Sequence, residues 1–386
     1  MQLPDYEGAG IVNLLSSLMT GLGGEPNGYV PLDGLSPAEV GAYRNVVLIV
    51  VDGLGYEFLI RRDHGSFLRR HLRGRMTSVF PSTTATAITS FLTGLAPQQH
   101  GLTGWHMYFK ELGTVLAVLP GVPRYGGIPL GKCGIEVEKF FGHGPIFDRI
   151  PLPCHIVSPR RIAHSDFNLA HQGKADLRAF DTLDEFFGVV AKTIRKDGHR
   201  KFIYGYWPEL DHIGHENGAD SAEVEQHLAE LDAAFTALFE SIAGTDTLLI
   251  VAADHGQIDS EAARIIELND HPELNECLIL PLCGERRAAY CYVKPGEAQR
   301  FERYVQDNLI AYLDLHRSRD LLASGWFGLG ASHPRLADRI GDYALILKEN
   351  YVIKDWLPGE RPYRQIGVHG GTTPEEMIVP LIVAAA

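Results

Sequence analysis

The sequence predicts an α/β fold in which helices cover both faces of a largely parallel sheet, giving a three-layer α/β/α sandwich. Three nearly continuous apolar runs are typical of strands buried on both faces: Asn45–Val51, Lys201–Tyr206 and Thr247–Ala253. Two segments near these runs, Asp181–Ile194 and Ser221–Glu240, carry apolar residues at helical spacing. Strands that alternate with helices favour helices packed on both sides of one sheet.

The length of 386 residues, with 45% hydrophobic residues, fits a single large domain (1–386) that carries insertions. Two segments interrupt the alternation of strands and helices. The first, about 106–175, is rich in Gly and Pro; the second, about 267–345, contains strand-like runs around a helix-like segment, Glu297–Leu313. Ligands of open α/β sheets bind beyond the carboxyl ends of the strands. We therefore expect both insertions to form a small cap over a site at that edge.

The N-terminal segment predicts a short docking helix rather than a signal peptide. No basic residue precedes its apolar part, which places Ile11, Leu14, Leu15 and Leu18 on one helical face. No run reaches the roughly 18 apolar residues of a membrane span. We expect a cytoplasmic protein with no membrane contact.

Composition narrows the classes of partner. The formal net charge of −13 disfavours nonspecific binding of nucleic acid, so no nucleic-acid-binding module is expected. Five cysteines without a CxxC pair indicate reduced core thiols instead of a disulfide framework or a cysteine zinc site. The expected partner is a small molecule, and the sequence leaves the oligomeric state open.

Each of the three predicted strands leads to an aspartate: Asp52, Asp211 and Asp254. Any one of them could cap a turn, but three histidines accompany them. His215 lies one helical turn after Asp211, His255 follows Asp254 directly, and His369 stands beside two glycines before the last strand. Three carboxylates and three imidazoles suit two zinc ions, whereas magnesium and calcium prefer oxygen ligands alone. The sequence therefore predicts a two-metal site.

Three hydroxyl residues, Ser82, Thr83 and Thr84, precede a helix-like stretch, Ala85–Leu92, which ends at Gly94. A hydroxyl at a helix N-terminus lies among free backbone N–H groups that favour a phosphate group. Ser and Thr are also preferred helix caps, so the pattern alone leaves a cap and a nucleophile open. An adjacent metal ion would make such a hydroxyl nucleophilic by stabilising the alkoxide.

The ordered set of motifs resembles the alkaline phosphatase superfamily, and within it the type I phosphodiesterase/nucleotide pyrophosphatase branch. The matching pieces span most of the chain: VVDG at 50–53, PSTT…TGLAPQQHG at 81–101, DHIGH at 211–215, ADHG at 253–256 and HGG…EEMIVPL at 369–381. The resemblance implies an alkaline phosphatase-like catalytic domain with two metal ions.

This resemblance also implies roles for single residues. One zinc would be held by Asp211, His215 and His369; the other would be held by Asp52, Asp254, His255 and the oxygen of Thr84. Manganese or another divalent metal could replace zinc. Thr84 aligns with the family nucleophile, which implies hydrolysis of phosphodiester, nucleotide or pyrophosphate substrates through a phosphothreonine intermediate. Two alternatives stay open: a phosphomonoesterase or phosphotransferase on the same core, and a non-catalytic, metal-stabilised binding protein.

The sequence departs from the family pattern after the nucleophile helix. Family phosphodiesterases commonly place an Asn there to hold a phosphate oxygen, but this chain has Trp105 at or near that position and His106 beside it. Either side chain could donate to the phosphate. Arg160 and Arg161, a doublet in the first insertion, could hold the extra charge of a monoester, although such a doublet is more often a solvated surface pair. Trp105, His106 and Arg160 are the predicted substrate contacts.

Overall fold

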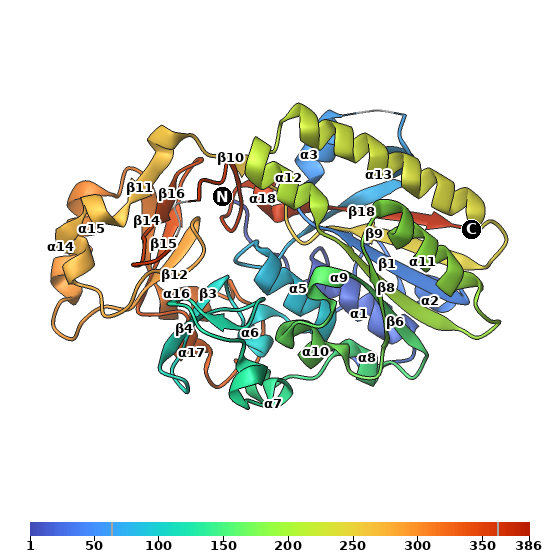
Figure 1. The fold of residues 1–386 in the computed structure, drawn as a ribbon, viewed down its shortest axis with the longest axis horizontal. Coiled ribbons are helices and arrows are strands. Elements are labelled where there is room, and N and C mark those ends of the chain that lie inside the picture. Colours follow the sequence, from blue (N-terminus) through green and yellow to red (C-terminus); the bar gives the residue numbers. More distant parts are fainter. Residues whose placement is uncertain (63–64, 361–362) are drawn as a thin grey trace.

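The computed structural model describes residues 1–62, 65–360 and 363–386, and it confirms the predicted α/β fold with a largely parallel central sheet (Figure 1). The seven strands lie in the order β2-β18-β9-β1-β8-β6-β7. Only β18 runs against the others within this sheet. The bounds are β1 (Asn45–Val51), β2 (Leu72–Thr77), β6 (Cys154–Pro159), β7 (Asp176–Phe180), β8 (Lys201–Trp207), β9 (Thr247–Ala252) and β18 (Ile378–Ala385).

The three apolar runs form the middle of this sheet, as predicted. β1 lies between β8 and β9, and all seven of its residues are buried. Because both faces of the central strands are covered, the side chains on both faces must be apolar, which explains the unbroken runs.

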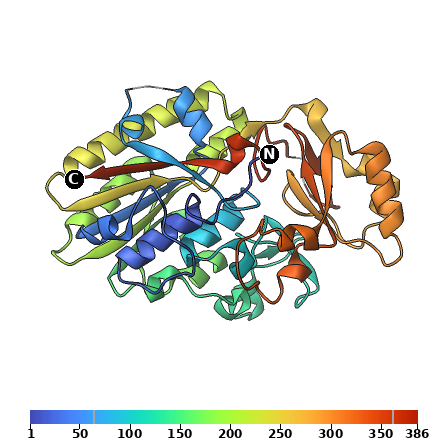
Figure 2. The ribbon, with the colours of Figure 1, turned by 180° about the vertical axis from the view of Figure 1, so that it is seen from behind.

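Helices cover both faces of the sheet. α11 (Leu183–Arg195) and α13 (Ala222–Ser241) pack on one face, and α1 (Ile11–Gly21) and α5 (Thr84–Thr93) pack together on the other (Figures 1 and 2). The helix predicted from 221 begins one residue later, because Ser221 is its N-cap and accepts the Val224 N–H at 3.3 Å.

The remaining helices are short. Those before residue 218, together with one near the C-terminus, are α2 (Pro37–Gly41), α3 (Tyr56–Arg61), α4 (Phe67–Arg70), α6 (Pro97–His100), α7 (Val137–Phe141), α8 (Ile146–Arg149), α9 (Arg160–Ala163), α10 (Asp166–Gln172), α12 (Glu209–Asn217) and α18 (Pro374–Met377). Those of the later segment are α14 (Pro272–Glu276), α15 (Ala298–Asn308), α16 (Ser318–Ala323) and α17 (Leu336–Arg339). The described residues also form three 3₁₀ turns: η1 (Leu130–Cys133), η2 (Ala262–Arg264) and η3 (Leu268–Asp270).

The expected N-terminal docking helix is α1, and it belongs to the core. Residues 11–19 are all buried, including the polar Asn13, Ser16 and Ser17. Of the helices in the described parts of the chain, none combines the length and apolar character that a bilayer crossing requires. The five cysteines are unpaired thiols in this structure, four of them buried.

A second, antiparallel sheet joins the two segments that interrupt the alternation. Its order is β14-β15-β13-β12-β3-β4-β5, and Gly284 of β12 pairs with His106 of β3. It lies beyond the carboxyl ends of the parallel strands (Figure 1). The bounds are β3 (His106–Phe109), β4 (Thr114–Ala117), β5 (Val122–Pro123), β12 (Cys283–Gly284), β13 (Ala288–Cys291), β14 (Leu313–Arg317) and β15 (Tyr343–Leu347).

The boundary of the first expected insertion, about 106–175, needs correction. β6 belongs to the central sheet, where it pairs with β7 and β8. Its six residues are buried, but His155, Ser158 and Pro159 interrupt the apolar pattern that would have marked a strand. The helix expected over 297–313 also ends earlier, at Asn308, and Leu313 begins β14. Two short ladders, β10 (Ile258–Asp259) with β17 (Gly367–Val368) and β11 (Ile265–Glu267) with β16 (Val352–Lys354), connect the two sheets along the chain.

Candidate active site

Three neighbouring strands bring the predicted aspartates to one edge of the central sheet. Asp52 follows β1, Asp254 comes two residues after β9, and Asp211 lies in α12, which begins just after β8. β1 separates β8 from β9, and all three strands are parallel, so their carboxyl ends meet. All three aspartates are buried there.

His255 lies at the centre of one group of polar atoms. Its Nε2 is 3.3 Å from Asp52 Oδ1, 3.4 Å from Asp254 Oδ2 and 3.1 Å from Thr84 Oγ1. The other ring nitrogen, Nδ1, lies 3.0 Å from the Gly256 carbonyl oxygen, which it can hydrogen-bond when protonated. That backbone contact directs Nε2 towards the carboxylates, because a hydrogen bond on one ring nitrogen fixes the orientation of the ring.

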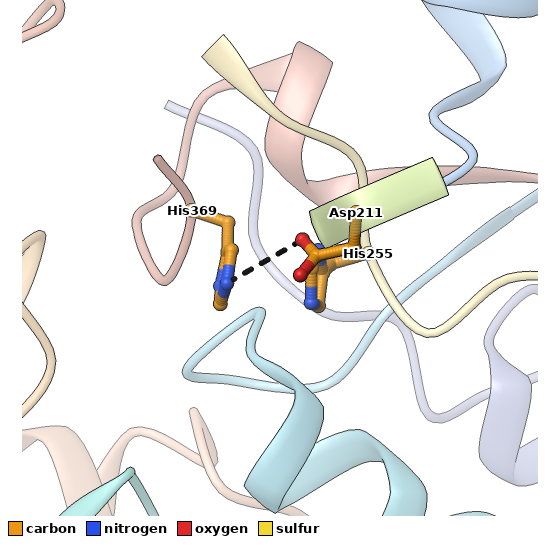
Figure 3. A group of neighbouring side chains, drawn as sticks. All are labelled: Asp211, His255 and His369. Carbon is orange, nitrogen blue, oxygen red and sulfur yellow. Dashed lines mark ion pairs between the residues drawn. The ribbon is translucent and has the colours of Figure 1, made fainter. Parts of the chain in front are cut away.

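Asp211, His215 and His369 form a second group beside the first. His215 Nε2 is 3.1 Å from Asp211 Oδ2, and His215 Nδ1 lies 2.7 Å from the carbonyl oxygen of Gly367. His369 Nε2 is 3.8 Å from Asp211 Oδ1, the contact that is dashed in Figure 3. The rings of His369 and His255 stack at 3.8 Å between centroids, so the two groups adjoin.

The donor atoms fit divalent metal ions. Asp211, His255 and His369 each offer a ligand atom within 4.8 Å of the others, and so do Asp52, Asp254 and His255. The structure thus places His255 between the two groups, where the family resemblance assigns it to one metal only. Among the described residues, three buried atoms of these candidate ligands have no hydrogen-bond partner: Asp52 Oδ1, Asp254 Oδ2 and His369 Nδ1. Buried carboxylates without a cation are costly, and a divalent metal ion would compensate them.

The pKa values of the three carboxyls also indicate that negative charge exceeds positive charge in this site. Burial raises the pKa of Asp52 well above its ordinary value, and the charges of Asp254 and Asp211 raise it further. Burial also raises the pKa of Asp254. Burial opposes ionisation of Asp211 as well, but the imidazoles of His215, His369 and His255 lower its pKa. The side with Asp52 and Asp254 is therefore the one that most lacks positive charge.

The three hydroxyls at the start of α5 differ in their partners. Ser82 donates to the Gly371 carbonyl at 2.8 Å, and Thr83, the N-cap residue, donates to Glu285 Oε1 at 2.8 Å. Thr84 is the first residue of the helix, and its Oγ1 lies 3.1 Å from His255 Nε2. Of the three, Thr84 is the hydroxyl directed at the metal-type ligands.

Two of the three predicted substrate contacts line a cavity beside Thr84, and the third does not. Trp105 and His106 both line a cavity of about 1140 Å³ that also contains Thr84 and ligands of both groups. Burial and the charge of Arg124 lower the pKa of His106 to about 3, so it is neutral at physiological pH. Arg160 is not among the described residues that line the cavity. It is exposed and pairs with Asp181 at 2.7 Å, while the next residue, Arg161, lines the cavity. A substrate contact by Arg160 therefore stays a prediction, without support from the cavity lining.

Several residues near the site were not predicted. Tyr206 donates its hydroxyl proton to Asp52 Oδ2, and Gln257 donates from Nε2 to Asp211 Oδ1. Glu285 accepts from Thr83 and from the Trp105 N–H at 2.6 Å, and its neighbour Arg286 lines the cavity. Glu285 and Arg286 stand between β12 and β13. Two opposite charges between apolar strands are a weak signal, typical of an ordinary hairpin turn.

The fold is a mixed α/β fold of the alkaline phosphatase type, with candidate metal ligands at the carboxyl ends of its parallel strands. The sequence profile of the type I phosphodiesterase/nucleotide pyrophosphatase family matches residues 46–372, and the chain belongs to this family. It is accordingly a hydrolase of phosphoric ester or anhydride bonds, which sets aside the non-catalytic alternative.

Solved structures agree on the fold. Murine ectonucleotide pyrophosphatase/phosphodiesterase 5 is similar at a TM-score of 0.67 and 17% identity, over 87% of each chain. An inactive variant of that murine protein in complex with AMP is similar at a TM-score of 0.65 and 18% identity, again over 87% of each chain. Phosphonoacetate hydrolase from Sinorhizobium meliloti 1021, in complex with phosphonoformate, reaches 0.63 and 18% identity over 89% of this chain and 90% of that one. No curated protein matches the sequence significantly.

Proposed function

We propose that the protein hydrolyses phosphodiester or pyrophosphate bonds of small molecules, nucleotides among them, with Thr84 as nucleophile and two zinc ions as cofactors. The single observation that carries the proposal is the position of Thr84 Oγ1. It lies at the N-terminus of a ten-residue helix and 3.1 Å from His255 Nε2, the atom that adjoins Asp52 and Asp254. The AMP found in the inactive murine relative is consistent with a nucleotide substrate.

The chain's own residues would act in two displacements. The oxygen of Thr84 attacks phosphorus in line, forming the Thr84 O–P bond as the bond to the leaving oxygen breaks. Backbone N–H groups of the first turn of α5 face the phosphoryl oxygens. In this first step the Thr84 hydroxyl gives its proton to solvent, and the departing oxygen takes one up. In the second step water forms a new O–P bond as the phosphothreonine bond breaks; the water gives a proton to solvent, and the Thr84 oxygen takes one up.

Metal ligands would divide between the two groups of side chains. Asp52, Asp254, His255 and Thr84 would hold one ion, and Asp211, His215 and His369 would hold the other. When bound, two divalent cations stabilise the alkoxide and the leaving oxygen. Tyr206 and the Gly367 carbonyl keep Asp52 and His215 in orientation. Nothing in this ligand set distinguishes zinc from manganese except its three imidazoles, which favour zinc.

Trp105 and His106 are the proposed substrate contacts in place of the family's Asn. Both line the cavity near Thr84, and Trp105 exposes 39% of its surface. The neutral imidazole of His106 has one N–H that can donate to a phosphoryl oxygen. Trp105→Ala and His106→Ala should raise KM for a diester more than they lower kcat; unchanged constants in both variants would rule out this contact.

Substitution of Thr84 tests the proposal. Thr84→Ala should lower kcat/KM for bis-p-nitrophenyl phosphate by at least roughly 10³-fold, because the nucleophile is removed. Ser82→Ala is the matched control, since that hydroxyl is bonded to the Gly371 carbonyl; it should retain activity within about tenfold. Acid quenching during turnover should trap phosphate on Thr84, which peptide mass spectrometry would detect.

Two outcomes would count against this function. Equal activity of Thr84→Ala and wild type would remove Thr84 as nucleophile. A clear preference of the wild type for p-nitrophenyl phosphate over the diester would instead establish the phosphomonoesterase alternative on the same core.

A further inference from the structure

Five Lys and Arg side chains line the cavity, and most of them are already paired. Arg124 pairs with Asp355 at 2.7 Å and with Glu360 at 2.9 Å, and only 5% of its side chain is exposed. Arg161 pairs with Glu209 at 2.9 Å, and Lys354 pairs with Glu267 at 3.0 Å. Within residues 1–62, 65–360 and 363–386, the side chains of Arg286 and Lys132 have neither an ion pair nor a hydrogen bond. Lys132 is exposed, whereas Arg286 is half-buried.

The backbone holds Arg286 in place between β12 and β13. Its carbonyl oxygen accepts the N–H of Ile353 at 2.9 Å, which ties the turn to β16. Burial and the Arg286 charge both lower the pKa of His106, and both oppose the rise that Asp211 causes in the pKa of His215. The guanidinium is therefore within electrostatic range of His215 and of His106 on the neighbouring strand β3.

Among the described residues, the neighbouring Glu285 forms no ion pair with Arg286, although its charge favours the protonated guanidinium. Its Oε1 accepts from Thr83 Oγ1 at 2.8 Å and from the Trp105 N–H at 2.6 Å, and it forms no ion pair with any described residue. Burial also raises the pKa of Glu285 to about 7, which leaves it only partly charged at neutral pH. Arg286 itself stays protonated at that pH, as arginines in proteins do.

A half-buried guanidinium without a partner has lost part of its hydration without gaining hydrogen bonds, which is unfavourable unless a ligand supplies them. Its planar set of N–H donors matches the two oxygens of a carboxylate or a phosphate. The transferred phosphoryl group already has the metal ligands and the N-terminus of α5 beside Thr84. The charge that Arg286 can complement is therefore a different one.

We propose that Arg286 binds a second anionic group of the substrate, a phosphate or a carboxylate on the part of the molecule that does not carry the transferred phosphoryl. This inference rests on the proposed phosphohydrolase function of the same cavity. It makes Arg286 a specificity-determining residue: diesters and anhydrides that carry a second anion are preferred over those that do not.

The test uses the full-length, zinc-loaded protein and three p-nitrophenyl phosphodiesters with the same leaving group. Their second ester is ethyl, carboxymethyl or phosphonomethyl, so two of them carry an additional anion. Arg286→Met should lower kcat/KM for these two by roughly 10- to 100-fold, and for the ethyl ester by less than about threefold. Arg286→Lys should restore part of the preference, because it keeps the charge without the paired donors. A loss on only one of the two charged esters would identify which anion is bound.

Arg161→Met is the matched control, because this cation lines the same cavity but is paired with Glu209. It should change kcat/KM for all three esters by the same factor. Equal losses on all three esters in Arg286→Met, or no loss on any, would overturn the inference. So would a selective loss on p-nitrophenyl phosphate, since Arg286 would then contact the transferred phosphoryl group.

The proposed function can fail separately. If wild-type protein hydrolyses none of the esters, isothermal calorimetry of the ethyl and carboxymethyl esters decides the inference. Tighter binding of the carboxymethyl ester to wild type that disappears in Arg286→Met would support it. Equal binding of both esters to wild type would overturn it.

Discussion

The two sheets contribute different chemistry to the cavity between them. The carboxyl edge of the central sheet supplies Asp52, Asp254 and, through α12, Asp211, which lie beside histidines. The negative charge of these buried carboxylates is not fully compensated by neighbouring cations. The second sheet supplies a hairpin with Glu285 and Arg286, and the Arg286 side chain has no hydrogen-bond or ion-pair partner in the described part of the chain. The central-sheet side therefore favours bound cations, whereas the second-sheet side contributes a cation of its own, the Arg286 guanidinium. A substrate with two anionic groups would complement both sides, and the predictions below test each side in turn.

The largest effect is expected on the central-sheet side. Asp254→Asn removes a buried charge that the metal on this side would need, so kcat/KM for bis-p-nitrophenyl phosphate should fall at least roughly 10³-fold. Elemental analysis should find about two zinc ions per wild-type chain and about one in the variant.

Asp307→Asn is a suitable control, because that aspartate is exposed in α15 on the side of the second sheet. It should leave both the zinc content and the rate unchanged. If Asp254→Asn kept two zinc ions and wild-type activity, Asp254 would not be a ligand, and the contrast between the two sides would lose its basis.

The central-sheet side could be read from sequence because its placement follows from topology. Asp52 and Asp254 follow apolar runs, and parallel neighbouring strands must bring their ends together. The sequence does not predict which ligand belongs to which group, because His255 stacks on His369 at 3.8 Å and adjoins both groups. That contact depends on the loop between β17 and α18, and the geometry of this loop has no local sequence signature.

The contribution of the second sheet to the cavity could not be predicted from the sequence. Arg286 reaches the cavity only because the two interrupting segments pair into one sheet, through Gly284 and His106, which are 178 positions apart by their numbers. Neither segment has a pattern that specifies the other. Arg160 illustrates the same limit in reverse: the doublet of arginines was visible, but which of the two faces the cavity depends on the direction of α9.

A buried ion pair links the two sides, and breaking it should have the next largest effect. Arg287, just before β13, contacts Glu376 of α18 through two hydrogen bonds of 3.1 and 2.9 Å, and both side chains are fully buried. Arg287→Met leaves the Glu376 carboxylate without its partner. The free energy of unfolding, measured with urea, should fall by about 3–5 kcal/mol.

The double variant Arg287→Met/Glu376→Gln supplies the control for this pair. It removes the uncompensated charge and should recover part of the lost stability. Because Glu376 also accepts the Gly371 N–H at 2.8 Å, close to His369, the recovery should be incomplete. A change below about 1 kcal/mol in the single variant would mean that the two sides are stabilised independently.

The smallest effect concerns the charge of Glu285 on the side of the second sheet. Burial raises the pKa of this carboxyl to about 7, above its ordinary value of 4.5. The folded chain therefore binds a proton more tightly than the unfolded chain between these values, so this group's contribution to stability is complete below about pH 4.5 and is lost as the pH rises through 7. Glu285→Gln resembles the protonated form and should make the free energy of unfolding less dependent on pH in this window. The exposed Glu261→Gln should keep the wild-type slope. If Glu285→Gln kept it too, Glu285 would be fully ionised in the folded protein and would offset the charge of Arg286, and the two sides of the cavity would no longer differ in sign.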